Sequence, residues 1–231
     1  MSIGVYIYGD SLMKATMPDR AFHYHFHLEE LLPRYVKEGV ELVNRAKMGA
    51  TVRKGRALVE HDVERGLAAN YALVAYGGND SDFDWAAISA EPEKDHRPRT
   101  ELIAFRQLLG ETVDALRGAG VQPVLMTLPP VDARRYLDFI CRGGLSRENI
   151  LRWLGDEQRI YRYQEAYSDT VANFAAERRL PLVDVRRPFL LDRQLPRLIA
   201  EDGIHLTLPG YTKLYDILTG WFRQELKGAT V

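Results

Sequence analysis

Five short apolar segments alternate along the chain with longer segments that have the periodicity of amphipathic helices. We expect the apolar segments to be strands, at residues 3–8, 40–46, 71–76, 121–128 and 180–185. The third of them is apolar throughout, which is typical of a strand buried on both faces of a sheet. Strands that alternate with helices form a parallel sheet with helices on both faces. The sequence therefore predicts a three-layer α/β fold around a five-stranded parallel sheet.

The segments between these strands have apolar residues at helical spacing. We predict helices at residues 22–36 with a break at Pro33, and at 51–67, 100–117, 161–179 and 208–226. Residues 131–160 are the least regular part and mix aromatic with charged side chains. We interpret them as a helical insertion, which either packs on the domain or forms a lid over a ligand pocket. Because the chain has no repeat or linker, we expect one domain over residues 1–231.

Charge and composition exclude several classes of protein. The 31 basic and 32 acidic residues nearly cancel, so nothing favours nucleic acid or an anionic membrane as a partner. Hydrophobic residues make up 46% of the chain, yet no apolar run approaches the roughly 18 residues of a membrane span. The lone cysteine, Cys141, excludes an internal disulfide, and the N-terminus has no secretory signal. We therefore expect a cytoplasmic protein; nothing in the sequence indicates its oligomeric state.

Three candidate site residues follow the first three predicted strands. Ser11, Gly49 and Asn79 come after residues 3–8, 40–46 and 71–76. Right-handed crossovers place the carboxyl ends of parallel strands at one edge of the sheet, where open α/β sheets bind ligands. We therefore expect the three residues to gather there. Serine is scarce, with six in the chain, and no Gly-x-Ser-x-Gly elbow occurs, so Ser11 is the candidate nucleophile.

A serine hydroxyl needs a base, and His205 is the best candidate because Asp202 lies three residues before it. The aspartate would accept a hydrogen bond from one ring nitrogen and leave the other for Ser11. The backbone amides of Ser11 and Gly49 and the side-chain amide of Asn79 would hold a developing oxyanion. The sequence thus predicts Ser11, Asp202 and His205 as catalytic residues, and Ser11, Gly49 and Asn79 as the oxyanion hole.

Four short blocks carry a resemblance to a known family. They are Gly9-Asp10-Ser11-Leu12, the isolated Gly49, Gly77-Gly78-Asn79-Asp80 and Asp202-Gly203-Ile204-His205. In this order, and spread over nearly the whole chain, they resemble the blocks of the SGNH (GDSL) hydrolases. The resemblance implies a flavodoxin-like fold and esterase, lipase or thioesterase chemistry without a metal or cofactor. It assigns the same roles to Ser11, Asp202, His205, Gly49 and Asn79, whereas Asp10 would only shape the turn.

We therefore expect a serine esterase that hydrolyses carboxylic esters through an acyl-enzyme intermediate, with small acyl or acetyl esters as the favoured substrates. Two alternatives stay open. The same site would serve an acyltransferase that moves acetyl groups onto sugar hydroxyls, and the fold also suits a non-catalytic flavodoxin-like binding domain. The sequence does not predict the acyl-chain length or the alcohol of the substrate.

Histidines at alternate positions, His23, His25 and His27, raise the question of a metal site. Such residues share a face only in an extended segment. On the helix that we predict for residues 22–36, residues two apart do not share a face, so no metal site is expected. Trp85 and the aromatic residues between 134 and 163 are candidate walls of the ligand pocket.

Overall fold

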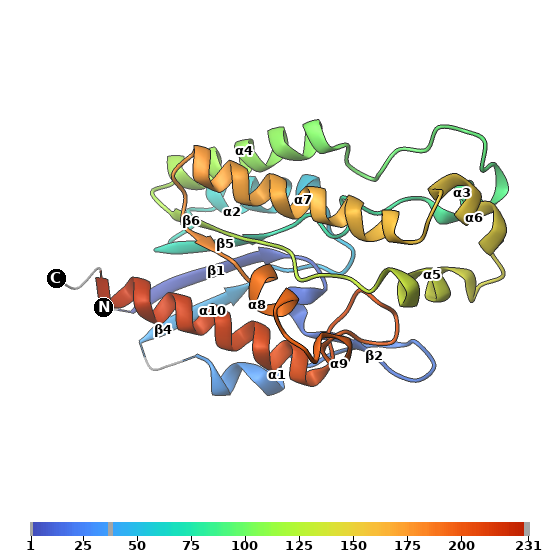
Figure 1. Ribbon diagram of the computed structural model, residues 1–231. Coiled ribbons are helices and arrows are strands. Elements are labelled where there is room, and N and C mark those ends of the chain that lie inside the picture. The colour runs from blue at the N-terminus through green and yellow to red at the C-terminus, as the bar shows by residue number, and fades with distance from the viewer. Residues whose placement is uncertain (1, 37–38, 229–231) are drawn as a thin grey trace.

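The computed structural model describes residues 2–36 and 39–228, and Figure 1 shows a sheet between two layers of helices. The main sheet is parallel, with the strand order β4-β1-β5-β6-β7. Its strands are β1 Ile3–Gly9, β4 Val40–Asn44, β5 Tyr71–Ala75, β6 Gln122–Met126 and β7 Leu182–Val183. The predicted flavodoxin-like fold with a five-stranded parallel sheet is confirmed.

Helices cover both faces of this sheet (Figure 1). One face packs against α2 Val52–Glu64, α4 Leu102–Gly118 and α7 Gln158–Glu177. The other packs against α10 Leu208–Gly228 and the shorter α1 Leu28–Leu31, α8 Arg186–Leu190 and α9 Leu195–Leu198. Single 3₁₀ turns lie at η1 Leu12–Lys14 and η2 Leu32–Arg34. None of the helices in the described ranges has an apolar stretch of the length that a bilayer crossing requires.

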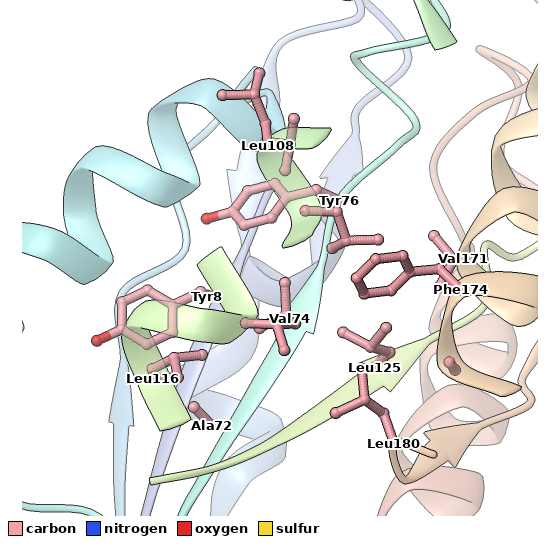
Figure 2. Close-up of a cluster of buried hydrophobic side chains, with 14 of the residues drawn as sticks. Tyr8, Ala72, Val74, Tyr76, Leu108, Leu116, Leu125, Val171, Phe174 and Leu180 are labelled. Carbon is pink, nitrogen blue, oxygen red and sulfur yellow. The ribbon is translucent and has the colours of Figure 1, made fainter. Parts of the chain in front are cut away.

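Neighbouring residues of each strand point to opposite faces and build two separate cores. Ile7 and Leu73 pack beneath α10. Their neighbours Tyr8 and Val74 pack in the other core (Figure 2), to which α2, α4 and α7 contribute. Full burial of such a side chain stabilises the fold by about 1.5–3 kcal/mol. Because β1 and β5 are central and buried on both faces, the loops that follow them start from fixed points.

The helix predicted for residues 22–36 is wrong over its first part. Thr16–Pro18 (β2) and Tyr24–Phe26 (β3) form an antiparallel hairpin instead. Aromatic and histidine side chains alternate along the second strand, and a period of two favours a strand over a helix. The carboxylate of Asp19 accepts hydrogen bonds from two backbone amides and closes the turn. These local interactions outweigh the helical spacing on which the prediction relied.

Residues 131–160 fold largely into two helices, α5 Ala133–Cys141 and α6 Arg147–Leu154. Together with α3 Trp85–Ala90, they lie beyond the carboxyl edge of the sheet (Figure 1). The three helices and the segment before α3 bury a third apolar cluster, which includes Phe83, Ile88, Leu137, Ile150 and Leu154. This cluster fixes one side of the space above the strand ends.

Candidate active site

Ser11 lies directly beyond the carboxyl end of β1, in a tight turn. A Cβ atom on Gly9 would collide with the side chain of Met13, so the end of this strand needs glycine. The carbonyl oxygen of Ser11 accepts hydrogen bonds from the hydroxyl (2.8 Å) and the backbone amide (3.2 Å) of Thr16. These bonds join the turn to β2. Ser11 is buried, so its hydroxyl occupies a defined position.

Three side chains from the two ends of the chain form a continuous hydrogen-bonded array. Ser11 Oγ lies 2.9 Å from His205 Nε2, and His205 Nδ1 lies 2.6 Å from Asp202 Oδ2. His205 and Asp202 are both buried. An imidazole between a carboxylate and a hydroxyl has one nitrogen protonated and the other free to accept a proton. The structure therefore brings together the three residues that the sequence predicts as catalytic.

The loop that carries Asp202 is rigid because its backbone and side chain are both engaged. Asp202 Oδ1 accepts hydrogen bonds from the amides of Ile204 (3.2 Å) and His205 (3.0 Å). Gly203 has φ +79° and packs so tightly on the backbone at the start of α5 that a Cβ atom would collide with Tyr136. Burial raises the pKa of Asp202, but the hydrogen bond and charge of His205, with the backbone amides, hold it below the usual value. Asp202 is thus a carboxylate at neutral pH.

Asn79 follows β5, the strand next to β1, and its side-chain amide is held by Asp10. Asn79 Nδ2 donates to Asp10 Oδ2 at 3.0 Å, and the amide of Leu12 donates to Asp10 Oδ1 at 3.0 Å. Asp10 is buried, and its desolvation raises the pKa to about 6 despite these hydrogen bonds. Asp10 therefore orients Asn79 in addition to shaping the turn, which the sequence did not predict.

A pocket opens from Ser11 and His205 toward α3, α5 and α7. One wall is aromatic and is built by Phe83, Trp85, Tyr136 and Tyr163, with Leu128, Pro129, Val131, Ile160 and Ile204 beside them. One carboxylate, Asp82, lines this wall and accepts hydrogen bonds from Trp85 Nε1 (2.8 Å) and the Tyr136 hydroxyl (2.7 Å). Trp85 and residues of the 134–163 region thus line the pocket. Both were candidate walls from the sequence.

Residues 7–213 match the model of the GDSL-like lipase/acylhydrolase family. The chain belongs to this family. It is accordingly a hydrolase that acts on ester bonds. Within its sequence, the family match runs from β1 to α10 and includes Ser11, Asn79 and His205.

Solved structures of similar fold accompany the family match. The GDSL-like hydrolase superimposes on a lipase/acylhydrolase from Enterococcus faecalis with a TM-score of 0.63 and 17% identity, covering 98% of this chain and 96% of that one. For a catalytic mutant of an acetylxylan esterase from Geobacillus stearothermophilus, the TM-score is 0.65 and the identity 19%, over 96% of this chain and 95% of that one. For the esterase EstA from Pseudoalteromonas sp., the TM-score is 0.61 and the identity 16%, over 97% of this chain and 98% of that one. At these identities the likeness shows a shared fold. No curated protein matches the chain by sequence.

Gly49 lies in an exposed turn after β4, with φ +67°. The amide of Ala50 donates to the carbonyl of Lys47 and closes this turn. Among the described residues of the hydrolase, those that line the pocket include Gly78 but not Gly49. The role of Gly49 as an oxyanion donor therefore stays a prediction.

Tyr24, in the unpredicted hairpin, is the residue of the site that sequence reasoning missed. Its ring centroid lies 4.9 Å from that of His205, with an interplanar angle of 53°. Burial and the adjacent Asp202 carboxylate raise the pKa of the Tyr24 hydroxyl well above its ordinary value. The alternation of aromatic and histidine residues from Phe22 to His27 was the available signal, because it predicts a strand with its aromatic side chains on one face.

On the outer face of the same strand, His23 and His25 each have a ring nitrogen 3.4 Å from Asp19 Oδ2. Our reason for expecting no metal here, a helix, is therefore wrong. Within residues 2–36 and 39–228, no group of three or more histidine, cysteine or acidic side chains has an arrangement that could hold a metal ion.

Proposed function

We propose that this GDSL-like hydrolase is a serine esterase that uses Ser11 as nucleophile, His205 as general base and Asp202 to orient the histidine. The array of hydrogen bonds at 2.9 and 2.6 Å, which ends at a pocket beyond the strand ends, supports this proposal most strongly. No step requires a metal or cofactor. Asp202 is ionised and buried, so it stabilises the imidazolium that forms when His205 takes the serine proton.

The reaction has two steps in the proposal. Ser11 Oγ attacks the ester carbonyl while its proton moves to His205 Nε2, and a tetrahedral oxyanion forms. The amides of Ser11, Gly49 and Asn79 donate hydrogen bonds to this oxyanion. His205 then protonates the departing alcohol as the C–O bond breaks. A water molecule, deprotonated by His205, next attacks the acyl-enzyme and releases the carboxylic acid and Ser11.

The pocket favours small acyl groups in this proposal. The aromatic rings of Phe83, Trp85 and Tyr136 line the same pocket as Ser11, and Phe83 and Trp85 are packed edge to face. Aromatic side chains packed in this way leave little freedom for the wall to open. A fold shared with an acetylxylan esterase is in keeping with short acyl groups. We therefore propose acetyl and other short carboxylic esters as substrates.

A series of p-nitrophenyl esters from acetate to dodecanoate tests the proposal on the purified protein. We expect kcat/KM to be greatest for the shortest acyl groups and to vanish in Ser11→Ala. A serine-directed phosphonate should label Ser11 and should leave Ser81 unlabelled, although Ser81 lines the same pocket. If the phosphonate does not label Ser11 in a protein that hydrolyses the esters, Ser11 is not the nucleophile.

Product analysis with acetylated sugars and free sugar acceptors distinguishes hydrolysis from acyl transfer. If the acetyl group appears as acetate in the presence of excess sugar, water is the acceptor. Transfer to the sugar hydroxyl would instead establish the acyltransferase alternative with the same three residues.

A further inference from the structure

The β2–β3 hairpin contacts two of the proposed catalytic residues: Thr16 is hydrogen-bonded to the carbonyl of Ser11, and Tyr24 packs on His205. His23 and His25, its neighbours in the strand, have side chains that are 77% and 57% exposed, so they occupy the opposite face. Tyr24 is half-buried, and its ring packs against the ring of His205. The strand alternation thus directs one aromatic residue onto the imidazole.

The hairpin is fixed at several points, so the position of Tyr24 is not left to a free loop. At its base, the hydroxyl of Tyr211 donates to the carbonyl of Thr16 at 2.7 Å. At its tip, the ring of Phe22 packs on Phe139 of α5, with centroids 5.3 Å apart, and Arg142 stacks over Phe22 at 3.9 Å. These contacts join the hairpin to α10 and α5, the two helices that flank the Asp202 loop.

The carboxylate of Asp202 has capacity for one more donor. A carboxylate offers about four acceptor positions on its two oxygens. Three donors are accounted for: the amides of Ile204 and His205 on Oδ1, and the His205 ring on Oδ2. Asp202 is fully buried, so solvent cannot reach the fourth position. The ring of Tyr24 packs on the ring of His205, which is itself hydrogen-bonded to Asp202. Burial and the charge of Asp202 raise the pKa of the Tyr24 hydroxyl, so the hydroxyl keeps its proton at neutral pH and is available to donate it to a hydrogen bond.

We propose that Tyr24 is a positioning residue of the catalytic array: its hydroxyl donates a hydrogen bond to Asp202, and its ring holds the imidazole of His205 toward Ser11. The inference rests on the proposed function of Ser11, Asp202 and His205. It adds a fourth residue, supplied by the hairpin, to the three that the chain ends contribute.

The role has a consequence for the protonation of His205. A hydroxyl that donates to Asp202 disperses part of the carboxylate charge, so the carboxylate attracts the imidazolium less strongly. Without the hydroxyl, the buried carboxylate would keep its three other hydrogen bonds but would carry more of its negative charge, so it would stabilise the imidazolium more. The other groups that face these residues are the Ser11 hydroxyl, the charge of Asp10, and Tyr211, which lies near Asp202. None of these changes when Tyr24 loses its hydroxyl.

The experiment compares Tyr24→Phe, which removes only the hydroxyl, with Tyr24→Leu, which also removes the ring. Tyr35→Phe is the matched control, because the Tyr35 hydroxyl donates to the carbonyl of Thr212, away from the pocket. The readout is kcat/KM for p-nitrophenyl acetate between pH 5 and 9. Its acid limb reports the groups of the free enzyme that must lose a proton, and Asp10, with a pKa of about 6, contributes in the same way to the wild type and to both Tyr24 variants.

We expect Tyr24→Phe to lose about three- to tenfold in kcat/KM at the plateau, because the ring stays in place and Asp202 loses only one of its four donors. The acid limb should move up by about 0.5 pH unit or more. Tyr24→Leu should lose more, and Tyr35→Phe should match the wild type. A Tyr24→Phe profile that superimposes on the wild type would overturn the proposal. If Tyr24→Leu does not fold, the pH profile of Tyr24→Phe alone still supports or overturns the proposal.

A second measurement separates this proposal from the proposed function. The pKa of His205 is determined by NMR in the Ser11→Ala background, with and without Tyr24→Phe, so that no turnover is needed. A higher pKa of His205 with Phe at position 24 supports the role of Tyr24; an equal pKa overturns it. Hydrolysis that persists in Ser11→Ala refutes the catalytic assignment instead.

Discussion

Substitution of Asp10 by asparagine should make the protein less active and, increasingly with pH, more stable relative to the wild type. Asp10 is buried, and desolvation raises its pKa from 3.8 to about 6 in the native state. In the unfolded chain the carboxyl group is in water and titrates near 3.8. The native state therefore binds more protons than the unfolded state between pH 4 and 6, and the wild type loses stability as the pH rises through this range.

The size of this loss follows from the pKa change. One pKa unit corresponds to about 1.4 kcal/mol, so the charge on Asp10 lowers the free energy of unfolding by about 3 kcal/mol above pH 6. Asparagine does not titrate and has no such loss. The charge of Asp10 also raises the pKa of the buried Asp80. The loss of that charge in Asp10→Asn therefore adds to the gain in stability of the variant over the wild type as the pH rises. The difference between Asp10→Asn and the wild type should therefore grow by about 3 kcal/mol between pH 4 and pH 7.5.

Urea denaturation at a series of pH values measures this difference, with Asp169→Asn, an exposed carboxylate on α7, as the control. The same variant should lose activity. In the wild type, Asp10 accepts a hydrogen bond from the side-chain NH₂ of Asn79. An asparagine at position 10 would place its own NH₂ against that donor, so Asn79 would lose its orientation and kcat should fall by about 10- to 100-fold. A stability difference that is the same at pH 4 and pH 7.5 would refute the reasoning, whatever its sign.

Three further outcomes are expected. Asn79→Ala should lower kcat by about 10²–10³, the usual loss for one oxyanion donor, with little change in KM; an unchanged kcat in steady-state assays would remove Asn79 from the oxyanion hole. Gly203→Ala should lower both the melting temperature and kcat, because φ is +79° and the new methyl group would collide with the backbone of Tyr136; a fully active variant of wild-type stability would contradict this. Prolonged treatment with EDTA should leave kcat/KM unchanged, and a loss restored by added metal ions would show that a metal takes part.

The main sheet could be predicted because its central strands carry strong signals. Apolar residues fill β1 and β5, and each strand ends at glycine or within a few residues of one. Prediction and structure agree less well at the edge of the sheet, where β7 has two residues although a strand was predicted over residues 180–185. An edge strand has one neighbour, so fewer hydrogen bonds define its ends. The hairpin was mistaken for a helix because its strands have only three residues each and the alternating residues run directly into the helix Leu28–Leu31.

The residues that we propose as catalytic could be selected from the sequence because of where they lie in the fold, but the contacts that support them could not be predicted. Ser11, Asn79, Asp202 and His205 lie at strand ends or before a helix, and the topology of a parallel sheet brings such positions together. The contact of Asp10 with Asn79 depends on the rotamers of two side chains 69 residues apart, and no periodicity records that.

The two supporting contacts act on different parts of the same array. Asp10 carries a charge that is costly to bury, yet it holds the amide of Asn79 where the oxyanion is proposed to form. Tyr24 is neutral, its ring packs on His205, and its hydroxyl is proposed to donate to Asp202 at the opposite end of the array. Loss of Asp10 should therefore change stability with pH and lower kcat, whereas loss of the Tyr24 hydroxyl should shift the acid limb of kcat/KM. If the two residues act on separate parts of the array, the reductions in kcat/KM of Asp10→Asn and Tyr24→Phe should multiply in the double variant. If kcat/KM of the double variant is no lower than that of the less active single variant, both residues support the same contact instead.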